Sequence, residues 1–287
     1  MDKGIVMTVQ IIQQQLDSFN CKNNTQEKNA IREITQEVVL AALSRSDFFA
    51  HATFLGGTCL RIVHGLNRFS EDLDFLLREP TPEFNLNDYL PNLMNELADF
   101  GYELEVTEKD KTESAVKKAF LKDSSLAKAL TLKHVSKTGK LAKIKIKFEV
   151  DTNPPAGGGA ELNYLDFPYA AELVTLDLPS LFAGKMHALL CRTYTKGRDW
   201  YDFIWYIRNQ VAINYGFLTS AINQQGPWSG QEITVNTDWV KKELAAKINS
   251  IDWKEAIEDV RRFVPENEQP SLDIWSSALF LSLLDKL

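Results

Sequence analysis

The sequence predicts an α+β protein, in which a small mixed β-sheet is preceded by a helical N-terminal segment and followed by a helical C-terminal region. Three observations lead to this prediction. Apolar residues recur at helical spacing near the N-terminus and again from residue 200 to residue 287. Between them, short apolar stretches alternate with polar residues at the two-residue period of strands. Turns rich in glycine and proline separate these stretches.

The first 80 residues are expected to form helices and the start of the sheet. Ile31, Ile34 and Val38 share one face of the second helix because they lie three or four residues apart. Pro80 should stop the last strand, since proline has no N–H to donate to a neighbouring strand. The expected elements are helices over residues 5–17 and 26–45, a strand at 54–55, a helix over 58–64 and a strand over 72–77.

Residues 87–151 are expected to add a helix and more strands. The clearest strand covers residues 141–151, where Ile146, Phe148 and Val150 face one way while Lys147 and Glu149 face the other. The other expected elements are a helix over residues 87–100, strands over 103–107 and 130–135, and a turn over 137–140.

A boundary near residue 175 is the simplest division of the chain, with one domain over residues 1–175 and a mainly helical domain over residues 176–287. Pro179 is expected to open the first helix of the second domain, because proline suits the first turn of a helix. A loop near residues 226–230 is the one interruption expected in the helical pattern that follows residue 200. A chain of 287 residues is long enough for one large or two moderate domains.

Composition narrows the class of protein. The chain is 44% hydrophobic and 25% charged, which is ordinary for a globular protein. Cys21, Cys59 and Cys191 are widely spaced and fit neither a zinc site nor a disulfide framework. The N-terminal residues contain no apolar signal core, and no apolar run reaches membrane-spanning length. We therefore expect a cytoplasmic protein with no membrane partner.

Charge is unevenly distributed along the chain. The formal net charge is −7, which argues against a general nucleic-acid coat protein. Residues 109–147 nevertheless contain twelve lysines and three acidic residues. This excess indicates either a solvated lysine face or a surface for a polyanion such as a nucleoside triphosphate or RNA.

The most informative stretch combines a glycine turn with two acids. Gly56, Gly57 and Thr58 precede a short helix, and Asp72 and Asp74 follow in an apolar strand. The strand period places the two carboxylates on one face, roughly 7 Å apart along the strand, where they repel each other. A divalent cation would remove this cost, and Mg²⁺ prefers a few carboxylates together with water and phosphate oxygens. Asp72 and Asp74 are therefore predicted metal ligands, the alternative being solvated acids at a sheet edge.

The turn itself suits a phosphate group. Gly56 and Gly57 would let the backbone approach a phosphate without a side-chain clash. Thr58 would either cap the helix or hold a phosphate oxygen through its hydroxyl. A glycine pair alone is usually only a turn, so the prediction depends on the whole strand–turn–helix–strand order.

These residues resemble motif I of the DNA polymerase β-type nucleotidyltransferases, in which a glycine turn, a spacer and Asp-x-Asp follow one another. The segment from Gly56 to Phe75, GGTCLRIVHGLNRFSEDLDF, resembles the AbiEii/AbiGii toxins of bacterial abortive-infection and toxin–antitoxin systems. A second block is similar to a downstream motif of that family, with Lys185, Arg192 and then Arg198-Asp199-Trp-Tyr-Asp202. The resemblance covers roughly residues 50 to 207.

The resemblance implies roles for further residues. Lys185 and Arg192 would contact the triphosphate of a nucleotide donor, and Asp199 or Asp202 would be an acid required for activity. Ser70 could help to hold phosphate. Two alternatives stay open for the second block: Asp199 could cap its helix, and Arg198 could form an ion pair with Asp202, four residues away.

A third carboxylate is usual in this superfamily on a later strand. Glu149 lies between Phe148 and Val150 and fits that pattern, with Asp151 as a neighbour on the same face. Glu149 would then ligate the metal or act as general base toward the incoming hydroxyl. The alternative is an ion pair between Glu149 and Lys145 or Lys147.

The leading hypothesis is an Mg²⁺-dependent nucleotidyltransferase that attaches a nucleotide from a nucleoside triphosphate to an acceptor such as tRNA. The resemblance implies a toxin role in phage defence or growth arrest, with a cognate antitoxin as partner. One alternative is a transferase that modifies a small molecule, as in aminoglycoside inactivation. The other is a catalytically dead nucleotide-binding or interaction module.

Overall fold

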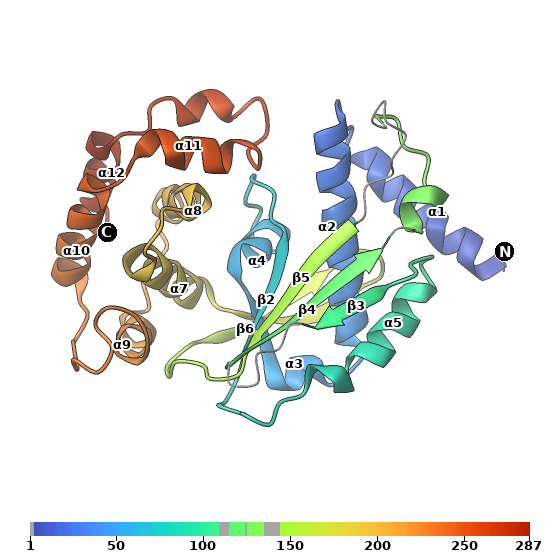
Figure 1. Ribbon diagram of the computed structural model, residues 1–287, viewed down its shortest axis with the longest axis horizontal. Helices are drawn as coiled ribbons and strands as arrows, with labels where there is room; N and C mark the ends of the chain where they lie inside the picture. The colour runs from blue at the N-terminus through green and yellow to red at the C-terminus, as the bar shows by residue number, and fades with distance from the viewer. Residues whose placement is uncertain (1–2, 109–114, 124, 135–143) are drawn as a thin grey trace. The chain divides into compact units, whose positions relative to one another are not determined.

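The computed structural model describes residues 3–108, 115–123, 125–134 and 144–287 (Figure 1). The expected turn at 137–140 and the first three residues of the expected strand 141–151 lie outside this part of the chain. The described chain divides into two compact units, which are treated separately below. Unit 1 comprises Met1–Val63, Ser70–Pro154 and Leu162–Thr175, and unit 2 comprises His64–Phe69, Pro155–Glu161 and Leu176–Leu287.

A mixed sheet of seven strands in the order β3-β4-β5-β2-β1-β7-β6 organises unit 1. β2 is antiparallel to β1 and parallel to β5, and β4 is antiparallel to both β3 and β5. The strands are β1 (Ala52–Leu55), β2 (Asp72–Leu77), β3 (Glu105–Glu108), β4 (Val116–Asp123), β5 (Ile144–Asp151), β6 (Ala160–Leu165) and β7 (Ala171–Leu176). The predicted α+β class, with a small mixed sheet, is confirmed.

Alternation along β2 and β5 gives the sheet one apolar and one polar face. Leu73 and Phe75 of β2 lie across from Phe148 and Val150 of β5, and all four are buried. The rings of Phe75 and Phe148 stack with centroids 4.7 Å apart, and the ring of Phe48 meets Phe75 edge-on at 4.9 Å. The polar side chains of β2 and β5 consequently share the opposite face.

The helices of unit 1 lie before and between these strands. Asn23 caps α2 by accepting a hydrogen bond from the backbone N–H of Gln26, which explains where this helix begins. Figure 1 shows α2 running beside the sheet, where it packs on β5. The helices are α1 (Lys3–Ser18), α2 (Asn24–Ser44), α3 (Phe48–His51), α4 (Gly56–Ile62), η1 (Leu86–Asp88), α5 (Leu90–Ala98) and α6 (Leu126–Ala129).

The expected strand over residues 130–135 is wrong in its described part. Residues 130–134 are irregular and follow the short helix α6. The backbone N–H groups of Lys133 and His134 donate to the carboxylate of Glu27 at 2.7 and 3.2 Å, so a side chain takes the place of a strand partner. The antiparallel partner of β5 is instead β4, a strand that the sequence patterns did not predict.

Unit 2 is helical, as predicted for the C-terminal region. Its helices are α7 (Leu178–Cys191), α8 (Gly197–Arg208), α9 (Tyr215–Gln224), α10 (Thr237–Asn249), α11 (Trp253–Arg261), η2 (Gln269–Leu272) and α12 (Ser277–Leu284). An aromatic core joins three of them: the ring of Phe280 stacks on Trp253 at 4.2 Å and meets Trp200 edge-on at 5.2 Å. Asp177 caps α7 through the backbone N–H of Ser180.

Within the part of the chain that the structure describes, no helix combines the length and the apolar character needed to cross a membrane.

Candidate functional site

The predicted site residues fall into two polar clusters, one in each unit. In unit 1, Asp72 and Asp74 lie on the polar face of β2, directly opposite Lys147 and Glu149 of β5. Both aspartates are half-buried, whereas Leu73 between them is fully buried. The predicted placement of the two carboxylates on one face of a strand is therefore what the backbone provides. We call Asp72 and Asp74 the aspartate pair.

The absence of a side chain at Gly56 leaves room for the carboxylate of the second member of this pair. Its φ is +83°, a left-handed conformation that favours glycine. A Cβ atom placed on Gly56 would lie only 2.5 Å from Oδ2 of Asp74. A side chain at position 56 would therefore displace the Asp74 carboxylate. Gly57 follows in the first turn of α4, and contact of either glycine with a phosphate stays a prediction.

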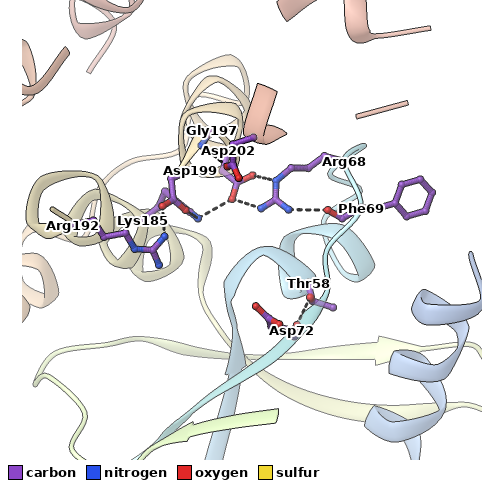
Figure 2. Close-up of polar contacts among 10 residues, drawn as sticks. Thr58, Arg68, Phe69, Asp72, Lys185, Arg192, Gly197, Asp199 and Asp202 are labelled. Atoms are coloured by element: carbon purple, nitrogen blue, oxygen red, sulfur yellow. Dashed lines mark hydrogen bonds and ion pairs between the residues drawn. The ribbon is translucent and has the colours of Figure 1, made fainter. Parts of the chain in front are cut away.

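Thr58 links α4 to β2. It is fully buried, and its hydroxyl donates a hydrogen bond to the backbone carbonyl of Asp72 (Figure 2). The suggestion that Thr58 caps the helix is wrong, because α4 begins at Gly56 and the cap position is Leu55. A phosphate contact through this hydroxyl stays a prediction. It would require the hydroxyl to give up its hydrogen bond to the carbonyl of Asp72.

Glu149 is held by two lysines. Its carboxylate forms an ion pair with Lys118 of β4 at 2.8 Å and another with Lys147. Although burial alone would raise the pKa of Glu149, the hydrogen bonds from the two lysines outweigh it and lower that pKa. The alternative predicted for Glu149, an ion pair with Lys147, is therefore present. As placed, this carboxylate is a weak base, and its catalytic role stays a prediction.

Asp151 and Ser70, the other residues predicted near this cluster, each form a hydrogen bond with a residue outside it. Asp151 accepts a hydrogen bond from the backbone N–H of Asn153 at 3.0 Å, at the end of β5. The backbone carbonyl of Ser70 accepts from the side-chain amide of Gln36 at 3.3 Å. Neither contact brings a third carboxylate to the aspartate pair.

The donor set of the aspartate pair suits Mg²⁺. No group of three or more His, Cys, Asp or Glu residues that could hold a metal ion occurs among the described residues. Mg²⁺ is commonly held by one or two carboxylates, with waters and substrate phosphates completing its shell. The carboxylate of Asp74 lies in the space next to Gly56 that a side chain at that position would fill.

In unit 2, Lys185 lies at the centre of a buried ion-pair network. Its Nζ is 2.7 Å from Oδ1 of Asp199 and 2.8 Å from Oδ2 of Asp202, and only 12% of the side chain is exposed. Lys185 is on α7 and the two aspartates are on α8, so the lysine joins these helices (Figure 2). The side chain of Lys185 therefore holds two acids, and its predicted contact with a triphosphate is untested.

Two arginines complete the network. Arg68 donates to both carboxylate oxygens of Asp202 at 2.6 Å, and its Nη1 donates to the carbonyl of Phe69 at 3.0 Å. Arg192 pairs with the other oxygen of Asp199. We call these five residues (Arg68, Lys185, Arg192, Asp199 and Asp202) the ion-pair network; Figure 2 shows them converging.

Burial makes this network electrostatically strong. Asp199 is 4% exposed and Asp202 is 0% exposed. Burial would raise the pKa of the Asp199 carboxyl, but the charges of Lys185 and Arg192 lower it to about 2. Burial would likewise lower the pKa of Lys185, and Asp199 and Asp202 raise it instead. Both partners are therefore charged at neutral pH.

Both local alternatives for the second block are wrong. Asp199 does not cap α8, because the cap position is Lys196 and the carboxylate of Asp199 binds Lys185 and Arg192. Arg198 is not the partner of Asp202: its guanidinium lies 4.2 Å from the ring centroid of Phe263. The backbone N–H of Gly197 donates to Asp259 at 2.8 Å, which anchors the start of α8.

Arg68 is the network residue that the sequence analysis left without a role. It lies in the spacer between the glycine turn and the aspartate pair, 134 residues before its partner. The one feature of the sequence that could have drawn attention to Arg68 is its position, a charged residue directly before Phe69 in a segment that follows an apolar helix. That signal does not identify a partner, because spacing rules reach only one or two helical turns.

Comparison with known proteins adds independent information. Comparison with curated protein sequences gives no match. Among solved structures, the chain is similar to MenT4, a nucleotidyltransferase toxin from Mycobacterium tuberculosis H37Rv, at 14% identity and a TM-score of 0.53, over 95% of this chain and 98% of MenT4. It is also similar to JHP933 from Helicobacter pylori, at 18% identity and a TM-score of 0.51, over 91% of this chain and 94% of that protein. These two likenesses establish the fold.

The family is established by sequence. The model of the family described as "Nucleotidyl transferase AbiEii toxin, Type IV TA system" matches residues 38–278, which include both the aspartate pair and the ion-pair network. The expected resemblance is thereby confirmed, and an antitoxin partner is implied by the family's place in toxin–antitoxin systems. The chain belongs to the AbiEii family of nucleotidyl transferase toxins.

Proposed function

We propose that this protein is an Mg²⁺-dependent nucleotidyltransferase that moves a nucleotide from a nucleoside triphosphate to a hydroxyl of a cellular RNA such as tRNA. The observation that carries the proposal is the aspartate pair on the polar face of β2, with the carboxylate of Asp74 occupying the space that a side chain at Gly56 would need. Two fixed carboxylates on one strand face are the minimum that this chemistry requires of a protein.

Asp72 and Asp74 are the residues that would hold the metal. When bound, Mg²⁺ supplies charge stabilisation for the triphosphate and for the oxygens that enter and leave the reacting phosphorus. Lys147 lies opposite Asp72, and its pKa is raised by Glu149, Asp72 and Asp74 although burial opposes this. A charged lysine at this position supports phosphate binding next to the aspartate pair.

The ion-pair network would hold in place the side chains of unit 2 that contact a ligand. Lys185 and Arg68 hold Asp202 at fixed distances, so these side chains orient one another. Arg192 is 34% exposed, so the N–H groups that do not face Asp199 can donate to a phosphate oxygen. Arg192 is therefore the network residue best suited to contact a ligand directly.

Charge favours RNA over a small cationic acceptor. The strand register puts Lys118, Lys145 and Lys147 on the same sheet face as the aspartate pair. Asp199 and Asp202, by contrast, are neutralised by Lys185 and the two arginines, so they offer little attraction to a cationic drug. The aspartate pair itself argues against a dead binding module. The family supports a toxin role, and we propose that the target reaction arrests growth.

The direct test is incubation of the protein with each α-labelled nucleoside triphosphate, total RNA and Mg²⁺. We expect label on RNA with the wild type, and a loss of at least about a thousandfold with Asp74→Asn, which keeps the shape but removes the charge. Asp151→Asn is the matched control, because it changes an acid on the same face away from the pair, and it should retain activity. Transfer that is unchanged in Asp74→Asn would overturn the proposal.

Gly56 gives a second test of the same site. Gly56→Ala leaves every charge in place but forces its Cβ to within 2.5 Å of Oδ2 of Asp74. Because a displacement of about 1 Å in a catalytic group can cost about a hundredfold in rate, transfer should fall by that order. Gly65→Ala is the control, since Gly65 also has a positive φ but no atom lies within 4 Å of its added Cβ.

Growth provides the cellular readout. Induced expression of the wild type should stop growth, whereas Asp74→Asn expressed to the same level should not. Growth arrest by both proteins would show that any toxicity is independent of nucleotide transfer.

A further inference from the structure

The connection between α7 and α8 presents an aromatic ring between two cations. Arg192, Tyr194 and Lys196 occupy alternate positions in this connection, which lies in unit 2. Tyr194 is 63% exposed, unlike the buried aromatic residues of the helical core. The guanidinium carbon of Arg192 is 6.0 Å from the centroid of the Tyr194 ring. The ring thus has the guanidinium of Arg192 near it, lies between two cations in the sequence, and is open to solvent.

Lys196 is a cation surrounded mainly by cations. Among the described residues, no carboxylate oxygen lies within 4.0 Å of its Nζ, although the side chain is half-buried. Three cations (Arg198, Arg192 and Lys185) and the acid Asp199 have the largest electrostatic effects on this side chain. Burial, followed by Arg198, lowers the pKa of Lys196, while the nearby Asp199 raises it. An anion bound here would relieve this repulsion.

The surrounding charges make the same surface more positive. Lys247 of α10 donates from Nζ to the backbone carbonyl of Arg192 at 2.6 Å. Lys185 is already bound to two acids, and Arg198 lies on the ring of Phe263. Lys196 and the outer N–H groups of Arg192 are therefore the donors that this surface offers to a ligand.

An exposed ring next to phosphate-binding cations is the combination that single-stranded nucleic acids require. Bases stack on aromatic side chains without regard to sequence, while lysine and arginine follow the backbone phosphates. A free nucleotide, in contrast, is normally enclosed over most of its surface. The 63% exposure of Tyr194 favours a strand held by several weak contacts over an enclosed mononucleotide.

We propose that the α7–α8 connection binds single-stranded RNA, with a base stacked on Tyr194 and phosphates contacted by Lys196 and Arg192. That this RNA is the acceptor of the reaction depends on the proposed function above. The binding itself does not depend on it, because a strand can stack on Tyr194 and contact Lys196 when neither metal nor triphosphate is present.

The test is binding of a fluorescently labelled single-stranded RNA of about twelve nucleotides, long enough to span one such site, measured by anisotropy without Mg²⁺ or nucleotide. We expect Tyr194→Ala to weaken binding about 5- to 30-fold and Tyr194→Trp to retain it, because stacking carries this contact. Lys196→Met should weaken binding and reduce the slope of log affinity against log salt by about 0.7, as expected for the loss of one phosphate contact with a single strand.

Matched controls separate this surface from a general effect of charge or exposed rings. Tyr164 is 68% exposed in unit 1, and the side chain of Lys242 is 80% exposed on α10. Tyr164→Ala and Lys242→Met should each bind RNA as the wild type does. Equal losses in the control and test variants would overturn the proposal, as would unchanged RNA binding by both Tyr194→Ala and Lys196→Met.

Two further measurements identify the ligand and separate the two proposals. A labelled nucleoside triphosphate that binds at micromolar concentration and loses as much affinity as the RNA does in Tyr194→Ala would show that the surface is a mononucleotide site, contrary to the inference. Asp74→Asn should bind RNA as the wild type does. If the wild type shows no nucleotide transfer but retains Tyr194-dependent RNA binding, the proposed function fails and the RNA site stands.

Discussion

The two polar clusters use the same residue type in opposite ways. The aspartate pair lies half-buried on a sheet face, where its carboxylates remain accessible to a ligand. Asp199 and Asp202 of the ion-pair network are at most 4% exposed and are neutralised by Lys185, Arg68 and Arg192. The carboxylates that we propose as metal ligands are half-buried, whereas the carboxylates that join α7 to α8 are buried against cations. The two settings predict different costs when each acid is removed.

The largest expected effect is on the network. Asp202→Ala should lower the free energy of unfolding of unit 2 by about 3–5 kcal/mol, because it leaves Arg68 and Lys185 buried without this partner. Denaturant unfolding followed by tryptophan fluorescence checks Asp202→Ala, since all six tryptophans lie in unit 2. Circular dichroism, which reports on both units, is measured alongside for both variants. Asp72→Ala is the comparison variant and should change stability by less than about 1 kcal/mol. Equal losses in the two variants would contradict the distinction between the clusters.

A buried acid of unit 1 provides the next test, at alkaline pH. Burial, together with the neighbouring Glu33, raises the pKa of Glu37 on α2 to about 8. Because the folded state holds this proton more tightly than the unfolded chain does, stability should fall as pH rises from about 4.5 to 8. Glu37→Gln removes the titration and should raise the free energy of unfolding at pH 9 by about 2–4 kcal/mol.

Circular dichroism is the suitable probe for Glu37→Gln, because it also reports on unit 1. The gain should vanish near pH 4, where Glu37 is protonated in both the folded and unfolded states. A gain of the same size at pH 4 and pH 9 would mean that packing, and not ionisation, explains the effect.

Asp199 should give the opposite pH dependence in unit 2. Its pKa is lowered to about 2, so its ion pairs contribute stability above about pH 4 that is lost as pH falls toward 2. We expect a loss of about 2 kcal/mol over this interval, measured by tryptophan fluorescence. Asp199→Asn should already be destabilised at pH 7 and should lose less on acidification than the wild type. An identical acid response in the two proteins would exclude Asp199 as the responsible group.

The smallest expected effect concerns the link between α4 and β2. Thr58→Val keeps the shape of this buried side chain but removes the hydroxyl that donates to the carbonyl of Asp72. The free energy of unfolding should fall by about 1 kcal/mol, the usual value of one buried hydrogen bond. Nucleotide transfer should fall more than this loss of stability explains, because Asp72 belongs to the aspartate pair. Transfer at the wild-type rate would show that this link has only a structural role.

Short-range patterns in the sequence predicted much of the fold. The aspartate pair and the two faces of β5 follow from strict two-residue alternation, and the structure reproduces both. Val116–Asp123 was missed because Lys117 and Lys118 are adjacent, so its polar residues do not alternate and the segment resembles a charged surface. Because of its many lysines, the sequence pattern did not identify β4, the strand whose Lys118 forms an ion pair with Glu149.

Pairing between residues far apart in the chain was the part of the candidate site that sequence patterns could not predict. Asp202 was matched to Arg198 by helical spacing, yet its partners are Arg68 and Lys185, which come from other parts of the chain. Local spacing describes one helix surface and contains no information on which distant segment packs against it. The same limit applies to Glu149, whose partner Lys118 is placed by strand pairing.

The position of Arg68 has a consequence for how the protein is made. Residues 64–69 leave unit 1 and belong to unit 2, although the rest of unit 2 begins about ninety residues later in the chain. A ribosome therefore releases the guanidinium long before it synthesises the carboxylate that will hold it. Until Asp202 is synthesised, the guanidinium of Arg68 stays hydrated. Units 1 and 2 therefore cannot fold one after the other as separate stretches of chain. Cutting the gene at codon 175 would for the same reason yield two incomplete fragments.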